Sequence, residues 1–220
     1  MTTERPKHST DSSWATIATD ADPDDLRECI FTGYKQGKPF TPYVPTIALP
    51  PAIEWVLDFG CGVGRNFPYL KSIARQVAGF DLEPMIQRCR ELAPEQIDLL
   101  FSDWEEVSRR RFDLVFASLV LQHVDTDVCR AYLEDFARMA PATYVITRLQ
   151  SDFGANVLGL VAESGLFEVH ECAEVEHDSE KNELRQVGLR SFDEVSRATD
   201  NLHYEVLLTP KPRINPAPAF

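Results

Sequence analysis

The run Val56-Leu57-Asp58-Phe59-Gly60-Cys61-Gly62-Val63-Gly64-Arg65-Asn66 decides the fold of this 220-residue chain. Its first part, preceded by Trp55, is a short apolar segment typical of a buried strand. Three glycines at alternate positions follow, and glycine permits both a tight turn and close approach of a ligand to the backbone. Ligands of open α/β sheets bind beyond the carboxyl ends of the strands. This turn is therefore the first candidate site.

After the turn, short apolar runs alternate with amphipathic helical patterns. Such a rhythm indicates parallel strands joined by helical crossovers. We therefore expect a Rossmann-like, doubly wound, mostly parallel α/β sheet. The expected strands are 55–59, 76–80, 97–102, 112–117 and 143–147, and the expected helices are 67–74, 84–92 and 127–139.

The pattern changes after Thr147. It predicts a helix near 156–164, a strand near 167–176, a helix within 183–198 and a strand near 203–208. The last two strands are expected to pair antiparallel, which adds an antiparallel edge strand to the sheet.

The residues before Ile53 do not fit this alternation. Residues 24–34 look helical, and glycines and prolines then break the chain repeatedly up to Pro51. We expect residues 1–52 to form a tail and an N-terminal helical cap or lid, residues 53–210 to form the main domain, and residues 211–220 to form a C-terminal tail.

Composition excludes several classes of protein. The formal net charge of −13 repels phosphate backbones and argues against a nucleic-acid substrate. No apolar run is long enough to span a membrane and no signal peptide is visible, so we expect a soluble, cytoplasmic protein without a membrane partner. The five cysteines are widely spaced and contain no C-x-x-C pair, which argues against a disulfide framework and against a metal site.

The glycine spacing separates this turn from two common nucleotide-binding motifs. A dinucleotide fingerprint would need glycine at the position of Arg65, and no G-K-[ST] follows to make a P-loop. Residues 56–66 instead resemble the first motif of class I S-adenosylmethionine-dependent methyltransferases, and the similarity covers roughly residues 53–150. The resemblance implies an enzyme with S-adenosyl-L-methionine as cofactor and S-adenosyl-L-homocysteine as product. The cofactor-binding residues that it implies in this run are Asp58, Gly60, Cys61, Gly62, Gly64 and Asn66, with Asp58 near the ammonium end.

Two further acids follow expected strands and resemble the family's second and third motifs. Asp81 can accept hydrogen bonds from both ribose hydroxyls. Asp103 can accept one from the adenine amino group, while Leu82 or Trp104 packs on the ring face. Three acids at the ends of three strands make a chance agreement improbable, although Asp81 alone would be weak evidence.

The run from Phe112 to Val124 resembles the fourth motif of small-molecule methyltransferases. It lacks the [ND]-P-P-[YF] pattern with which amino-methylating nucleic-acid enzymes grip a flipped base. Ser118 is expected to touch the methionyl group. His123, just beyond the strand, is the candidate general base, and the alternative is a histidine that caps the following turn.

The acceptor side is less informative. Tyr34 and Tyr43 could close over the cofactor or pack within the cap, and Arg148 could bind an acceptor carboxylate or phosphate or form a surface ion pair. We expect a small-molecule acceptor that the sequence does not identify. The alternatives are a protein methyltransferase and a non-catalytic S-adenosylmethionine-binding subunit, and the oligomeric state stays open.

Overall fold

The structure is a computed structural model and describes residues 19, 42–92, 97–149, 156–178, 183–198, 200 and 202–212. The predicted helix at 24–34, with Tyr34, lies outside these residues. The strands are β1 (Ile53–Phe59), β2 (Ala74–Phe80), β3 (Leu99–Phe101), β4 (Leu114–Ser118), β5 (Thr143–Arg148), β6 (Phe167–Asp178), β7 (Glu183–Leu189) and β8 (His203–Pro210). The helices are α3 (Phe67–Ile73), α4 (Glu83–Leu92), α5 (Trp104–Ser108), the 3-10 turn η1 (Leu121–His123), α6 (Thr126–Met139), α7 (Val157–Ser164) and α8 (Phe192–Val195).

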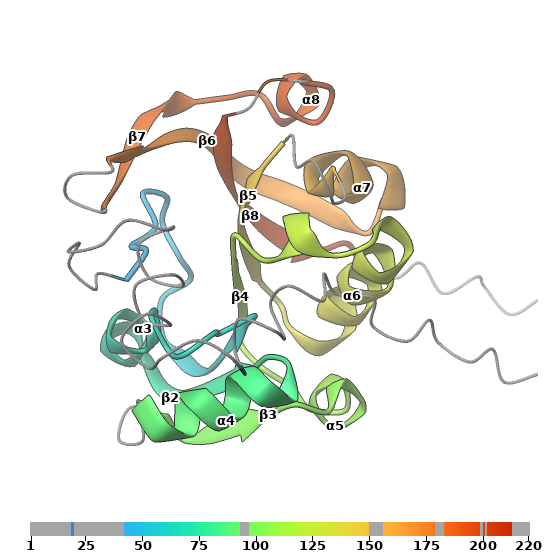
Figure 1. Cartoon of the computed structure of the whole chain (residues 1–220). Helices are drawn as coiled ribbons and strands as arrows, with labels where there is room; N and C mark the ends of the chain where they lie inside the picture. Colours follow the sequence, from blue (N-terminus) through green and yellow to red (C-terminus); the bar gives the residue numbers. More distant parts are fainter. Residues whose placement is uncertain are drawn as a thin grey trace, which may run out of the picture.

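The strands form one eight-stranded sheet in the order β3-β2-β1-β4-β5-β8-β6-β7 (Figure 1). Pairs among β1 to β5 are parallel, which confirms the predicted Rossmann-like architecture. The antiparallel part is wider than the single edge strand expected. β8 pairs antiparallel with β5 and with β6, and β7 then pairs antiparallel with β6.

The helix predicted within 183–198 is confirmed only in part. Phe192–Val195 is helical, and residues 183–189 are strand β7. The reason is tertiary, because β6 extends to Asp178 and offers a free hydrogen-bonding edge to the returning chain. Leu184 packs against the core on the face that carries α3, and the register with β6 shifts between Gln186 and Gly188.

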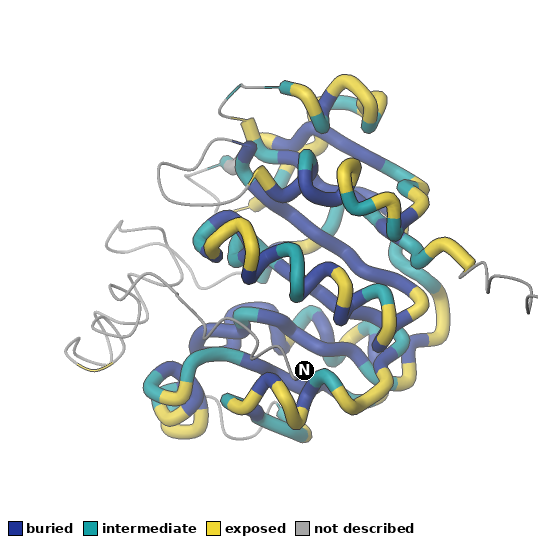
Figure 2. Tube along the Cα trace, turned by 90° about the vertical axis from the view of Figure 1, so that its right-hand side faces the viewer, coloured by how far each residue is buried: buried dark blue, intermediate teal, exposed yellow. Residues whose placement is uncertain are grey.

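Helices cover both faces of the sheet, so its central strands are buried on both sides (Figures 1 and 2). Helices α5, α6, α7 and α8 contribute to the core on one face. Helices α3 and α4 contribute to the core on the other face, together with Ile47 from the segment 42–50 that precedes β1. Because each central strand is covered twice, it reads as a continuous apolar run rather than an alternating one.

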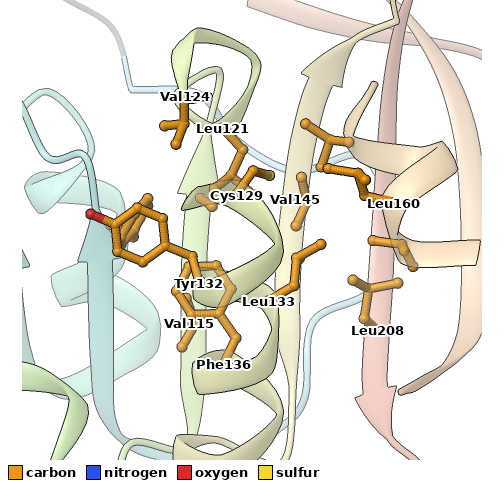
Figure 3. Packing of buried hydrophobic residues seen from close by; sticks show 14 of the residues in the cluster. Val115, Leu121, Val124, Cys129, Tyr132, Leu133, Phe136, Val145, Leu160 and Leu208 are labelled. Carbon is orange, nitrogen blue, oxygen red and sulfur yellow. The ribbon is translucent and has the colours of Figure 1, made fainter. Parts of the chain in front are cut away.

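The core under α6 is built mainly from large apolar side chains (Figure 3). Residues of α6 point toward β4 and β5, with Leu160 of α7 and Leu208 of β8 completing the packing. Phe59 makes edge contacts with Tyr132 and Phe136, at centroid distances of 4.7 and 5.0 Å. The carboxyl end of β1 is therefore fixed by aromatic packing from α6.

A buried carboxylate ties the segment 42–50 to the sheet. Glu205 of β8 is fully buried and accepts hydrogen bonds from the Tyr144 hydroxyl (2.8 Å) and the Thr46 backbone amide (3.1 Å). The Thr46 hydroxyl also donates to it. Burial raises the pKa of Glu205, and these donors lower it in part. The segment is thereby held across the face that carries α3.

None of the described helices is both long and apolar enough to cross a membrane.

Replacing Trp104 by phenylalanine should destabilise the protein by about 1 to 3 kcal/mol. The Trp104 indole N–H donates to Asp135 at 2.7 Å, and Asp135 is only 3% exposed, so the change leaves a buried acceptor with one partner fewer. Urea denaturation measures the loss. Half-buried Trp55 is the matched control, since its indole makes no hydrogen bond within the described residues. An equal loss for Trp55→Phe would show that packing alone accounts for the effect.

Candidate active site

The glycine turn begins where β1 ends, at the middle of the carboxyl edge of the sheet. The backbone amides of Gly60 and Cys61 both donate to the Phe80 carbonyl at the end of β2, at 2.8 and 3.1 Å. Gly60, Gly62 and Gly64 have φ values of +71°, +56° and +91°, a region that side chains with a Cβ rarely adopt. The chain therefore turns sharply here because glycine adopts these angles without strain.

The segment after β4 packs directly on this turn. A Cβ placed on Gly60 would lie 2.3 Å from Cγ2 of Val120. Leu119, between Ser118 and Val120, has a φ of +55°, which is strained for a branched residue. The Leu119 amide donates to Ile146 of β5 at 2.9 Å, and this contact helps hold the strained conformation. Sequence reasoning missed this turn because Leu119 carries no turn signal.

Asp58 is the most unusual group at this edge. It is fully buried, and neither carboxylate oxygen makes a hydrogen bond of normal geometry with any described residue. Burial raises the pKa of Asp58 to about 8, although the nearby Asn66 amide lowers it and the charge of Asp81 raises it. A buried carboxylate without donors is costly unless a ligand supplies them. The position next to the glycine turn makes Asp58 the strongest candidate for contact with a cationic ligand.

Asp81 closes the turn from the side of β2. Its carboxylate accepts hydrogen bonds from the backbone amides of Gly62 and Leu82, both at 2.7 Å. Burial raises the pKa of Asp81 to about 6, and these two amides oppose the rise. Each carboxylate oxygen has a second lone pair, so the group retains capacity for further donors.

The two site residues predicted after β3, Asp103 and Trp104, differ in exposure. Asp103 is exposed and caps α5, since its carboxylate accepts the Glu105 amide at 2.8 Å. Trp104 was predicted to pack on a ligand ring. It is 5% exposed, its ring packs against Phe80 and Tyr132, and its N–H is bonded to Asp135, so it belongs to the core.

Beyond β4 the chain places Ser118 and His123 at the same edge. Ser118 is half-buried, and its covered hydroxyl has no hydrogen-bond partner within the part of the chain that the structure describes. His123 is half-buried, with Nε2 at 3.3 Å from the Gln122 side-chain nitrogen. Gln122 is buried and its oxygen accepts the Arg148 backbone amide at 2.6 Å. Sequence reasoning missed Gln122. The one available signal was a polar residue among apolar ones directly after β4.

Arg65 and Asn66, directly after the glycines, contact the segment before β1. The Arg65 guanidinium lies 3.6 Å from the centroid of the Tyr43 ring. The Asn66 side-chain oxygen accepts the Tyr43 backbone amide at 3.1 Å. These contacts seat Tyr43, predicted as a cap residue, beside the glycine turn.

Cys61 lies within the glycine turn but does not have the character of a nucleophile. Its side chain is 3% exposed, and burial raises the pKa of the thiol well above its usual value. Because the thiolate is the reactive form, the side chain acts here as a small apolar group. No group of three or more potential metal ligands comes together among the described residues.

Residues 56–141 match the sequence model of a methyltransferase domain. This region holds the glycine turn, the acids at the carboxyl ends of β1 to β3, and the whole of β4 and η1. This part of the chain is therefore similar to methyltransferase domains. No match was found among curated protein sequences.

Several solved structures are similar to this chain. The N-methyltransferase NodS from Bradyrhizobium japonicum WM9, solved with S-adenosyl-L-homocysteine, is 14% identical with a TM-score of 0.56, and the match covers 92% of this chain and 100% of that one. Magnesium protoporphyrin IX methyltransferase from Synechocystis PCC 6803 is 16% identical with a TM-score of 0.47, and the match covers 73% of this chain and 71% of that one.

Gly60→Ala should destabilise the protein through two separable causes. The clash with Val120 should cost about 1 to 3 kcal/mol. The left-handed φ should add about 1 to 2 kcal/mol. Urea denaturation of Gly60→Ala, Val120→Ala and the double variant forms a cycle that separates them. The alanine at position 60 should cost less in the Val120→Ala background, and equal costs in both backgrounds would contradict the close contact.

The stability of the ligand-free protein should fall as pH rises from about 4 to about 8. In this window the folded protein retains the proton on Asp58 that the unfolded chain has released. Asp58→Asn should therefore flatten the dependence of the unfolding free energy on pH. Asp193→Asn, at an exposed position of α8, is the matched control and should leave the slope unchanged. Identical slopes for wild type and Asp58→Asn would mean that Asp58 is ionised throughout.

Proposed function

We propose that this chain transfers a methyl group from S-adenosyl-L-methionine to a small-molecule acceptor. The observation that carries the proposal is the buried Asp58 carboxylate, which lies beside the glycine turn and has no hydrogen-bond donor of normal geometry within the described residues. A ligand with an ammonium group beside a sulfonium supplies both the donors and the positive charge that such a carboxylate lacks. The presence of S-adenosyl-L-homocysteine in NodS supports the same use of this fold.

The residues at the edge fit the parts of that cofactor. The backbone of Gly60, Cys61, Gly62 and Gly64 lines its methionine portion, with Asp58 at the ammonium. Asn66 contributes through its contact with Tyr43, which keeps the segment before β1 close to the turn. When bound, the cofactor supplies an electrophilic methyl group on a sulfonium.

Asp81, Leu82 and Asp103 serve the nucleoside portion in this proposal. Asp81 lies next to the turn and can accept the ribose hydroxyls with its remaining lone pairs. Half-buried Leu82 offers an apolar side chain for one face of the adenine, a role that Trp104 no longer shares. Asp103 is exposed at the start of α5, where it can accept the adenine amino group.

The acceptor lies on the side of β4 and β5. Ser118 presents a hydroxyl without a partner among the described residues to the methionyl group, and His123 follows it on η1. Methyl transfer requires mainly alignment of an acceptor lone pair and removal of its proton. His123 is the candidate base, and its contact with Gln122 holds the imidazole at the edge. A net charge of −13 supports an acceptor other than nucleic acid.

S-adenosyl-L-homocysteine should raise the unfolding free energy by about 2.7 kcal/mol at about 100 times its dissociation constant. NAD and ATP should not. Calorimetry on wild type, Asp81→Asn and Asp58→Asn measures the rise, which should shrink in both variants because each loses a carboxylate for the ligand. Asp193→Asn is the control and should respond like wild type. No rise in folded wild type would overturn the proposal, and transfer of a labelled methyl group to a small acceptor would complete it.

A further inference from the structure

Arg148 is the last residue of β5 and is held at the carboxyl edge of the sheet. Its backbone amide donates to buried Gln122, and the residue lies opposite His203 of β8 in the strand register. The side chain is half-buried, and its Nε atom is covered and has no hydrogen-bond partner among the residues that the structure describes. The main chain is thus fixed while the guanidinium retains donors to offer.

Arg148 shares a face of the sheet with the candidate cofactor site. Asp58 pairs in register with Phe116, and Ser118 pairs with Ile146, so alternation places Asp58, Ser118 and Arg148 on one side. Each of the three has a covered polar atom that lacks a hydrogen-bond partner within the described residues. They lie on the adjacent strands β1, β4 and β5. Neighbouring strands are about 4.8 Å apart, and Arg148 comes four residues after Tyr144, which is level with Asp58 in the register. Arg148 therefore lies about 10 Å across the sheet from Asp58 and about 13 Å further along the strands.

The surroundings of the Arg148 guanidinium differ from those of the other arginines that are half-buried or buried. Four described arginines are half-buried or buried. Arg65 packs on Tyr43, while Arg88 and Arg130 form ion pairs with glutamates. Arg148 forms no ion pair with any acid in the described ranges, in a chain with 35 acidic residues against 22 lysines and arginines. A partly desolvated guanidinium is costly unless an anion pairs with it.

We infer that Arg148 binds an anionic group of the methyl acceptor, a carboxylate or a phosphate. The inference rests on the proposed function and names the class of acceptor for that site. A guanidinium presents a planar fork of donors that matches both groups. Arg148 belongs to the acceptor rather than to the cofactor's amino-acid end, because Asp58 fixes that end two strands away. Ser118 lies on the strand between them.

The test uses the full chain saturated with S-adenosyl-L-homocysteine and three aromatic probes. Benzoate carries a carboxylate, phenyl phosphate carries a phosphate, and benzamide is the neutral analogue. Calorimetric titration compares wild type with Arg148→Met, which keeps the length of the side chain, and Arg148→Lys, which keeps its charge. Arg197→Met is the matched control, since Arg197 is exposed and forms no ion pair with the described acids. Thermal midpoints establish that each variant is folded.

At least one anionic probe should bind wild type more tightly than benzamide does. Arg148→Met should weaken that binding about tenfold to a hundredfold, because a charge-assisted pair of hydrogen bonds is lost. Arg148→Lys should weaken it less, Arg197→Met should leave it unchanged, and the affinity for S-adenosyl-L-homocysteine should be the same in all four proteins. Whichever of benzoate and phenyl phosphate binds more tightly identifies the acceptor's anion.

Three results would overturn the inference while leaving the proposed function in place. The first is that neither anion binds the loaded wild type. The second is that an anion binds Arg148→Met as tightly as wild type. The third is that Arg148→Met weakens the binding of S-adenosyl-L-homocysteine as much as the binding of the probes. The third result would assign Arg148 to the cofactor. Failure of S-adenosyl-L-homocysteine to bind wild type would overturn the proposed function itself, and the inference with it.

Discussion

The Phe80 carbonyl accepts two backbone amides, from Gly60 and Cys61, and this pair of hydrogen bonds sets where β1 ends. The chain can meet this constraint only by turning through left-handed backbone angles, which explains why glycines follow the strand. The same turn brings the Gly62 amide to Asp81 and leaves Asp58 beneath it without a donor of normal geometry from the described residues. The positions of the glycine turn, Asp58 and Asp81 are thus linked to the Phe80 carbonyl.

The electrostatics of that edge change along the sheet. Asp58, near the end of β1, and Asp81, directly after β2, are carboxylates whose pKa values are raised by burial. A nearby positive charge favours the ionised form of both. Two strands from Asp58, at the end of β5, lies the half-buried guanidinium of Arg148. A cofactor and an acceptor that together span this edge therefore meet carboxylates at one end and a guanidinium at the other. This difference in charge orients the two ligands.

The sequence predicted the parallel half of the sheet well because each of its strands is buried on both faces. Runs such as 114–117 are apolar throughout, and the acids at the ends of the first three strands stand out. The region after β5 was harder. The pattern of residues 183–189 does not distinguish a helix from an edge strand. These residues form a strand because they pair with the free hydrogen-bonding edge of β6.

Side-chain direction explains the other differences between sequence and structure at the site. Trp104 follows β3 at the expected position, but its indole reaches Asp135 of α6, a partner 31 residues away that no local pattern reveals. The strained backbone of Leu119 turns the chain so that Val120 packs on Gly60 and Gln122 accepts the Arg148 amide. Motif spacing located the strand ends correctly, whereas packing decided which side chains face the edge.

The position of β8 also constrains the order in which the molecule can form. This strand comes last in the described chain, yet it lies in the sheet between β5 and β6. During synthesis, β6 and β7 can pair with each other as an isolated hairpin but cannot join the parallel strands until residues 203–210 have left the ribosome. An isolated two-stranded hairpin is marginally stable in water. The final strand therefore acts as the closing piece of the sheet, and a ribosome that stops short of it releases a chain with β5 and β6 both unpaired on the sides that β8 would have joined.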